Sequence, residues 1–137
     1  MEGFHSTFSA VGYRTNFSPV AWAGSFAPAA LPQWERDLCG VISFERPGER
    51  RRALVFEYSA GLVSVMHDDS RSLWASARQL PLQSKFVVAD SGATIPAGSL
   101  VSLERAWLLV EQFLEDSLCC PAGQWADAGL LDWPEDF

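Results

Sequence analysis

The sequence lacks the marks of a membrane-bound or exported chain. No apolar run approaches the roughly 20 residues needed to cross a bilayer, and residues 1–14 have neither the charged start nor the continuous apolar stretch of a signal peptide. Cysteine is scarce, and an odd number of three with Cys119 and Cys120 adjacent is a poor disulfide framework. We therefore expect a cytoplasmic protein with free thiols and no membrane partner.

Groups suited to catalysis are also few. Only His5 and His67 can act as bases near neutral pH. His67 precedes Asp68 and Asp69, an order that resembles a general base beside the acid that orients it. The three cysteines could serve as nucleophiles. The sequence alone does not show whether the fold brings these groups together in one site. No nucleophile elbow, phosphate-binding loop, dinucleotide fingerprint or metal-ligand spacing is present. We expect no enzymatic activity, no cofactor and no metal site.

Positive charge is scarce toward the C-terminus. Residues 1–100 hold nine acids and nine bases, whereas residues 101–137 hold eight acids and only Arg105. The formal net charge of -7 therefore resides in the last quarter of the chain. Such a surface repels nucleic-acid phosphates and attracts a basic protein, mainly by raising the association rate, although a charge run can also serve solubility alone. A protein partner is expected, and no nucleic acid.

The length of 137 residues, 48% of them apolar, suits a single domain with its own core. Residues 1–34 are rich in proline and aromatic residues, so we expect an irregular segment there. Alternation predicts a strand over residues 40–46, ended by a turn at Pro47-Gly48. The arginines at 50–52 then form a solvated turn rather than a phosphate site.

Residues 53–68 predict a β-hairpin. Leu54, Phe56 and Tyr58 share one face, and Ser59-Ala60-Gly61 turns the chain. Residues 72–81 are ambiguous between strand and short helix, and residues 85–90 read as another strand. The strand-rich region thus extends over residues 40–90.

The clearest element is an amphipathic helix over residues 102–117. Ser102 is a suitable N-cap, Glu104 suits the helix dipole, and Pro121 and Gly123 follow the helix. The apolar face recurs at intervals of three and four residues, at Leu103, Ala106, Trp107, Val110, Phe113, Leu114 and Ser117. The expected fold is α+β, with an antiparallel sheet of about four strands packed by this long C-terminal helix.

Residues 118–137 form an acidic tail that also carries aromatic and aliphatic side chains, among them Trp125, Leu130 and Trp133. A tail that only solvates the chain would lack such residues. The tail can either fold back on the core or present an apolar anchor ringed with carboxylates, which is the composition of an interface hot spot. We expect Trp125 to be a structural lock, and Trp107 and Phe113 to belong to the core.

The order of these elements resembles the first-numbered immunity protein family (Imm-one) of bacterial polymorphic toxin systems, over about residues 40–126. The residues that carry the resemblance are the hairpin at Val55-Phe56-Glu57-Tyr58 with Gly61, residues 95–102, the helix at residues 106–114 with Glu111, and Pro121. The closing pattern of that family is matched by Val101-Ser102, Gln112-Phe113, Pro121 and Trp125.

The resemblance implies a cytosolic, non-enzymatic inhibitor that binds one cognate toxin, often a nucleic-acid deaminase or nuclease, and blocks its active site. Such enzymes have basic clefts, which an acidic surface can occupy in place of the substrate. The residues expected to bind the toxin are Asp68, Asp69, Glu111, Glu115, Asp116, Asp127, Asp132, Glu135 and Asp136, with Trp133 as a possible apolar anchor.

An alternative interpretation is a small-ligand-binding or adaptor domain whose aromatic residues line a pocket, since the chain has six tryptophans. Tryptophan in a domain of this size more often serves packing than a ligand cage. The role of Trp74 is open. So are the identity of a toxin and the formation of homo-oligomers.

Overall fold

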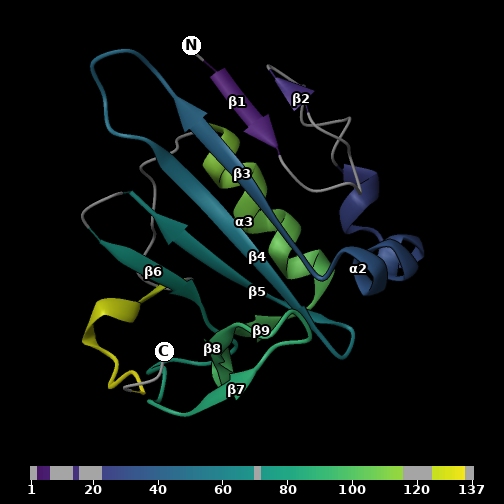
Figure 1. Ribbon diagram of the computed structural model, residues 1–137, viewed down its shortest axis with the longest axis vertical. Coiled ribbons are helices and arrows are strands. Elements are labelled where there is room, and N and C mark those ends of the chain that lie inside the picture. Colours follow the sequence, from purple (N-terminus) through teal and green to yellow (C-terminus); the bar gives the residue numbers. More distant parts are fainter. Residues whose placement is uncertain (1–2, 7–13, 16–22, 70–71, 116–124, 135–137) are drawn as a thin grey trace.

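The computed structural model describes residues 3–6, 14–15, 23–69, 72–115 and 125–134 (Figure 1). Within these ranges an antiparallel sheet carries a long helix on one face, which confirms the predicted α+β class. The strands follow the order β10-β6-β5-β4-β3-β1-β2, with β9 beside β5. Their bounds are β1 Gly3–Ser6, β2 Arg14–Thr15, β3 Cys39–Glu45, β4 Arg52–Ser59, β5 Leu62–Asp68, β6 Leu73–Ser76, β9 Leu100–Val101 and β10 Trp125–Asp127.

The predicted number of about four strands is too low, because the described residues form an eight-stranded sheet. Three of its strands, β2, β9 and β10, have only two or three residues each. An alternating pattern needs about four residues or more to be recognised. These short strands exist because a neighbouring strand is available to pair with, which a local pattern cannot reveal.

The central hairpin of β4 and β5 is as predicted. Ser59 pairs with Leu62, and the two turn residues between them both have positive φ, 51° at Ala60 and 86° at Gly61. A two-residue turn with this backbone matches the twist of the flanking strands. Leu54, Phe56 and Tyr58 are all buried, so they share the inner face of the sheet.

The long helix α3 (Leu103–Glu115) begins where the sequence predicts. The backbone N–H of Arg105 donates to the Ser102 hydroxyl at 3.2 Å, which is the expected cap. Phe113 is buried as expected, whereas Trp107 is only half-buried, with its ring 5.6 Å from that of Phe26. The inward stripe centres on Ala106, Val110 and Phe113 and includes Leu109, so Trp107 lies at its edge.

The expectation of an irregular segment over residues 1–34 is wrong in part. Besides β1 and β2, the segment holds the short helices η1 (Gly24–Phe26) and η2 (Pro28–Ala30) and the start of α2 (Leu31–Asp37). Pro32 stands in the first turn of α2, where a helix does not need its missing N–H. Trp34 is fully buried and donates its indole N–H to the Ser25 carbonyl at 2.7 Å. The prolines therefore start a helix here.

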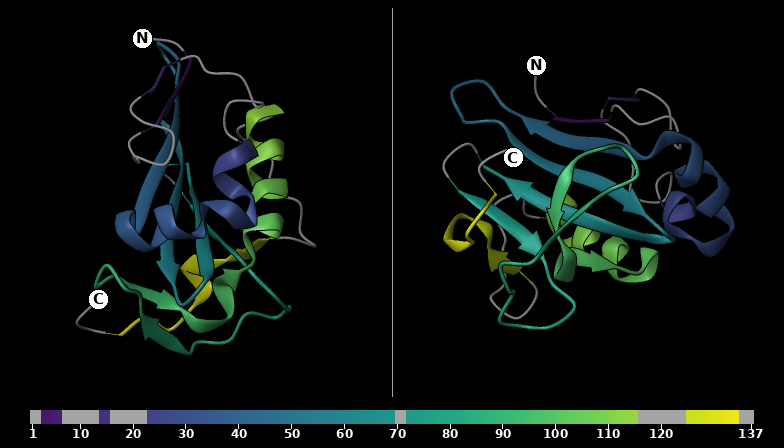
Figure 2. Two further views of the ribbon diagram at one scale, coloured as in Figure 1. Left: turned by 90° about the vertical axis from the view of Figure 1, so that its right-hand side faces the viewer. Right: turned by 60° about the horizontal axis from the view of Figure 1, so that its bottom comes forward.

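The opposite face of the sheet carries a second, smaller layer. The predicted strand over 85–90 exists as β7 (Phe86–Val88), but it pairs with β8 (Thr94–Pro96) in a separate two-stranded sheet. The ambiguous segment over 72–81 contains strand β6. In the left view of Figure 2, α3 lies on one side of the main sheet. No helix in the described ranges is long and apolar enough to cross a membrane.

Candidate protein-binding surface

The expected toxin-binding residues fall on three separate parts of the fold. Glu111 and Glu115 lie on α3, Asp68 and Asp69 at the end of β5, and Asp127, Asp132 and Trp133 in the C-terminal segment. Asp116, Glu135 and Asp136 lie outside the described residues. Each part offers a different surface, and the helix offers the most regular one.

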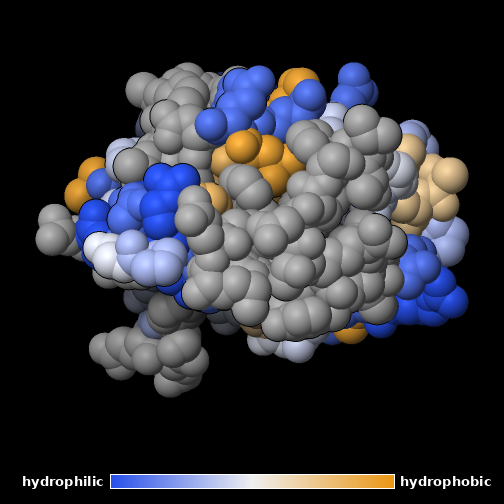
Figure 3. All heavy atoms as spheres, turned by 90° about the horizontal axis from the view of Figure 1, so that it is seen from above, coloured by the Kyte–Doolittle hydropathy of each residue, from blue (hydrophilic) through white to orange (hydrophobic). Residues whose placement is uncertain are grey.

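The outer stripe of α3 consists of Glu104, Leu108, Glu111 and Glu115. Spacings of four, three and four residues place these side chains in one row along the helix. All four are exposed, and Leu108 keeps 51% of its surface accessible. Among the described residues, no ion pair joins any of the three glutamates to a base. In the view from above (Figure 3), hydrophilic and hydrophobic residues lie together at the upper edge of the picture.

Asp68 and Asp69 lie side by side in the sequence but have different surroundings. Asp68 is exposed at the last position of β5. The Asp69 carboxylate accepts hydrogen bonds from the Ser72 backbone N–H at 2.7 Å and from the Ser72 hydroxyl at 3.1 Å. It therefore holds the connection from β5 to β6.

His67 does not form a catalytic group with these aspartates. It is 1% exposed, and its ring lies 5.6 Å from the ring of Phe113 and 5.8 Å from that of Trp125. Successive side chains of a strand point to opposite faces, so His67 faces the core while Asp68 faces solvent. The expected role of Trp125 as a structural lock agrees with its burial at 3% exposure.

The C-terminal segment folds back on the sheet. β10 pairs with β6, and the short helix η4 (Ala128–Leu130) is capped by Asp127, whose carboxylate accepts the Gly129 N–H at 2.9 Å. The Trp133 indole N–H donates to the Ala128 carbonyl at 2.8 Å, and its ring lies 4.8 Å from that of Phe86. Trp133 thus fastens the segment.

The apolar side chain that this segment presents to solvent is Leu130, at 83% exposure. Leu130 was not among the residues expected to bind a partner. The sequence does indicate that Leu130 is exposed, because this residue follows the turn former Gly129 and precedes the acidic end of the chain. Asp132 is exposed beside it, and its backbone N–H donates to the Ser84 hydroxyl at 2.9 Å.

Cys39 lies in an acidic surrounding that the sequence did not reveal. Partial burial raises the pKa of its thiol, and the nearby carboxylates of Glu57 and Asp37 raise it further. A nucleophilic cysteine needs the opposite environment, one that favours the thiolate. Cys119 and Cys120 lie outside the described residues.

Tyr58 belongs to the same acidic region. Its hydroxyl donates to Glu35 at 3.4 Å, and burial, together with the charges of Glu35 and Asp90, raises its pKa. These acids come from α2, β4 and the turn after β7, so only the folded chain brings them together. In the part of the chain that the structure describes, no three His, Cys, Asp or Glu side chains are arranged to hold a metal ion.

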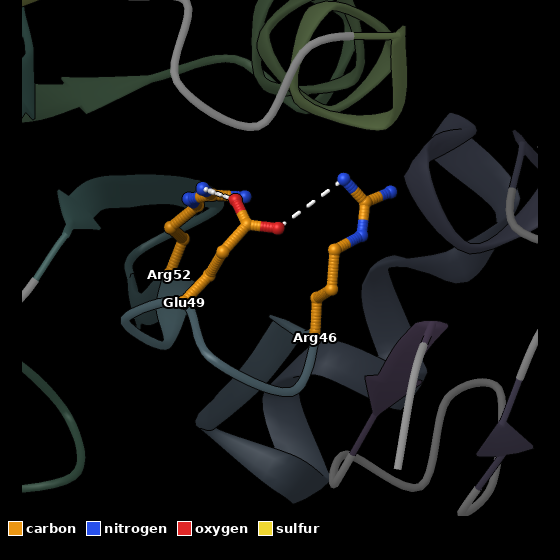
Figure 4. Close-up of polar contacts among 3 residues, drawn as sticks. All are labelled: Arg46, Glu49 and Arg52. Carbon is orange, nitrogen blue, oxygen red and sulfur yellow. Dashed lines mark hydrogen bonds and ion pairs between the residues drawn. The ribbon is translucent and has the colours of Figure 1, made fainter.

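Two arginines of the β3–β4 turn share one carboxylate. Glu49 contacts Arg52 at 2.6 Å and Arg46 at 3.2 Å (Figure 4). Its pKa is lowered, first by the hydrogen bond from Arg52 and then by the charge of Arg46. Both guanidinium groups also lie over the ring of Phe44, at 5.1 Å for Arg46 and 5.5 Å for Arg52. Arg52 is buried rather than solvated, whereas Arg50 and Arg51 are exposed as expected of a solvated turn.

The tryptophans of the described ranges serve packing. Trp34 and Trp125 are buried, Trp74 and Trp107 pack against the main core, and Trp133 packs on the second cluster. Comparison of the chain with models of protein families, with curated proteins and with solved structures finds no match. What the chain does must therefore be argued from its own surfaces.

Proposed function

We propose that this protein is an immunity protein of the Imm-one type, which binds one basic bacterial toxin in the cytoplasm and blocks its active-site cleft. The observation that carries the proposal is the outer stripe of α3, where three exposed glutamates flank an exposed leucine. A toxin that acts on nucleic acid, such as a deaminase or nuclease, has a cleft of the opposite charge.

The stripe combines the two features that a protein interface requires. Leu108 supplies apolar area that loses contact with water on binding, and carboxylates around it supply charge complementarity and orientation. Because α3 is held by five buried side chains on its inner face, the backbone of its outer face is already ordered before binding, and the entropy cost falls mainly on the exposed side chains.

The exposed ends of the sheet and of the C-terminal segment extend the acidic surface. Asp68, Leu130 and Asp132 are exposed. We assign them a secondary role, while Asp69, Asp127 and Trp133 act mainly through the fold.

The experiment that tests the proposal is a pull-down with tagged protein from the native cytosol at low and at moderate salt, with bound proteins identified by mass spectrometry. Recovery of one basic toxin-like protein, inactive in the complex and active when free, is the expected result. An empty eluate at both salt concentrations would contradict the proposal and favour the alternative of a small-ligand-binding or adaptor domain.

A charge-reversed pair locates the binding surface. Glu111→Lys with Glu115→Lys should weaken toxin binding at least about tenfold, since two favourable charge contacts become repulsive, while the melting temperature stays nearly unchanged at these exposed sites. The control is Glu35→Lys with Asp90→Lys, which makes the same charge change elsewhere. Equal weakening in both pairs would show that net charge, and not the stripe, governs binding.

A further inference from the structure

A hollow of about 550 Å³ lies between the loop at residues 78–85 and the backbone of Ala97-Gly98. Its volume is within the range of small-molecule sites, about 300 to 1,000 Å³. The loop joins β6 to the small β7–β8 sheet, which lies at the bottom of the molecule in Figure 1. The hollow is therefore built from elements other than α3.

The charge of the hollow is opposite to that of the molecule. Among the described residues that line it, Arg78 and Lys85 are the charged ones, and both are basic. Among the described residues, neither of these two bases forms an ion pair. In a chain with a net charge of -7, two bases that line one hollow create a local site for an anion.

Backbone hydrogen bonds fix both sides of the hollow to the same short segment. The Arg78 N–H donates to the Gly98 carbonyl at 3.0 Å, and the Ala97 N–H donates to the Lys85 carbonyl at 2.8 Å. The Arg78 guanidinium donates from Nη2 to the Ala97 carbonyl at 3.2 Å. This bond uses one of its five N–H groups and leaves others for a ligand.

The rest of the lining is apolar or amide. Leu80, Pro81 and Leu82 form a hydrophobic wall, and the amides of Gln79 and Gln83 stand beside the two bases. Leu82 packs so close to Gly98 that a Cβ atom at Gly98 would lie 2.8 Å from Leu82 Cδ1. A ligand that fits this lining has an anionic group at one end and an apolar body at the other.

We propose that this hollow binds a small organic anion, with its carboxylate or phosphate group between Arg78 and Lys85 and its apolar part against the leucine wall. The planar guanidinium matches two oxygens of such a group, and the lysine adds a point charge. The acidic stripe on α3 takes a ligand of opposite charge, so the two sites are independent.

Isothermal titration of the full-length protein with phenyl phosphate, with benzoate and with inorganic phosphate tests this site. The expected result is saturable binding of at least one of the two organic anions, tighter than that of inorganic phosphate, with benzyl alcohol not binding. No saturable binding of either organic anion up to about 10 mM would overturn the proposal. Equal affinity for phenyl phosphate and inorganic phosphate would overturn the role of the apolar wall.

Variants assign the binding to the two bases. Arg78→Gln and Lys85→Gln should each raise Kd about tenfold or more, because each removes a charge-assisted contact to the anion. Arg36→Gln, which removes an arginine whose guanidinium donates to Gln33, should leave Kd unchanged. If Arg78→Gln disturbs the loop, Lys85→Gln alone still tests whether the anion binds at this site. Binding that is insensitive to both substitutions, or equally sensitive to the control, would overturn the assignment.

Discussion

At the scale of single residues, small polar side chains hold the two layers of the protein together. The hydroxyls of Ser64 and Ser99 lie 2.7 Å apart, and the Ser76 hydroxyl donates to the Ser99 carbonyl at 2.7 Å and accepts the Val65 N–H at 3.0 Å. All three serines are fully buried. A buried polar group is tolerated when its hydrogen bonds are made, so these contacts connect β5 and β6 to the segment that carries the anion hollow.

The environment of Cys39 predicts that its thiol reacts slowly with alkylating reagents near neutral pH. In a Cys119→Ser, Cys120→Ser background, the pH midpoint for alkylation by iodoacetamide should lie above 9.0, because burial and then the carboxylates of Glu57 and Asp37 raise the pKa. Glu57→Gln should lower this midpoint, whereas Glu45→Gln should not. A midpoint at or below the ordinary thiol value would contradict this account.

The raised pKa of Cys39 also sets the direction in which stability changes with pH. Since the pKa of the Cys39 thiol is raised in the folded state, its contribution to folding is present below the unfolded pKa and is lost as the pH rises through the folded value. Tyr58 behaves in the same direction, with an ordinary pKa of 10.0. The free energy of unfolding should therefore fall at alkaline pH, because both Cys39 and Tyr58 lose their protons there.

At the scale of secondary-structure elements, α3 both packs on the sheet and presents a surface to solvent. Its inner stripe packs on the sheet, and its outer stripe stays free for a partner. The 3.6-residue period separates the two stripes, so a change on one can leave the other intact. The exact rotation of the helix decides that Leu109 lies inside and Trp107 at the edge.

This rotation can be tested by truncation. Phe113→Ala should cost about 3 to 5 kcal/mol because it leaves a cavity in the core, and Trp107→Ala should cost less, about 1 to 2 kcal/mol, because part of its ring is already in water. Urea unfolding followed by circular dichroism measures both. A larger loss for Trp107 would mean that α3 is rotated from the orientation described.

At the scale of the whole molecule, charge is arranged in regions of unlike sign. Acidic side chains cover the outer side of α3 and the region around Tyr58, arginines are paired with Glu49 at the β3–β4 turn, and the hollow beside Arg78 is basic. A uniform negative surface would repel every anion equally. This arrangement allows a basic protein and a small anion to bind at different places.

The association of the proposed toxin with this protein should depend on salt. Raising the salt concentration from about 50 mM to about 300 mM should lower the association rate constant about tenfold or more and change the dissociation rate constant little, because screening acts mainly on the approach of the partners. Surface plasmon resonance measures both constants. Charge reversal at Glu111 and Glu115 should flatten the salt dependence, and an association rate that ignores salt would exclude electrostatic steering.

Several features could be read from the chain because their signals are local. Alternation identified β3 and the β4–β5 hairpin, and the helical period with the Ser102 cap identified α3. The positions of Glu111 and Glu115 on the exposed side of α3 follow from the same period. A single domain, a cytoplasmic location and the toxin as partner remain predictions, because none of them is a property of local structure.

Other features depend on pairing between segments that are distant in the sequence. The strand β10 exists because β6 offers a free edge, the acids near Cys39 and Tyr58 come from three elements, and Arg78 meets Lys85 only through the backbone at Ala97-Gly98. Whether Trp133 faced a partner or the fold was also decided by a distant contact, with Phe86. Elements with a local period could be predicted from the chain alone. Every surface built from several elements depends on tertiary contacts, since no local pattern encodes a contact between distant residues.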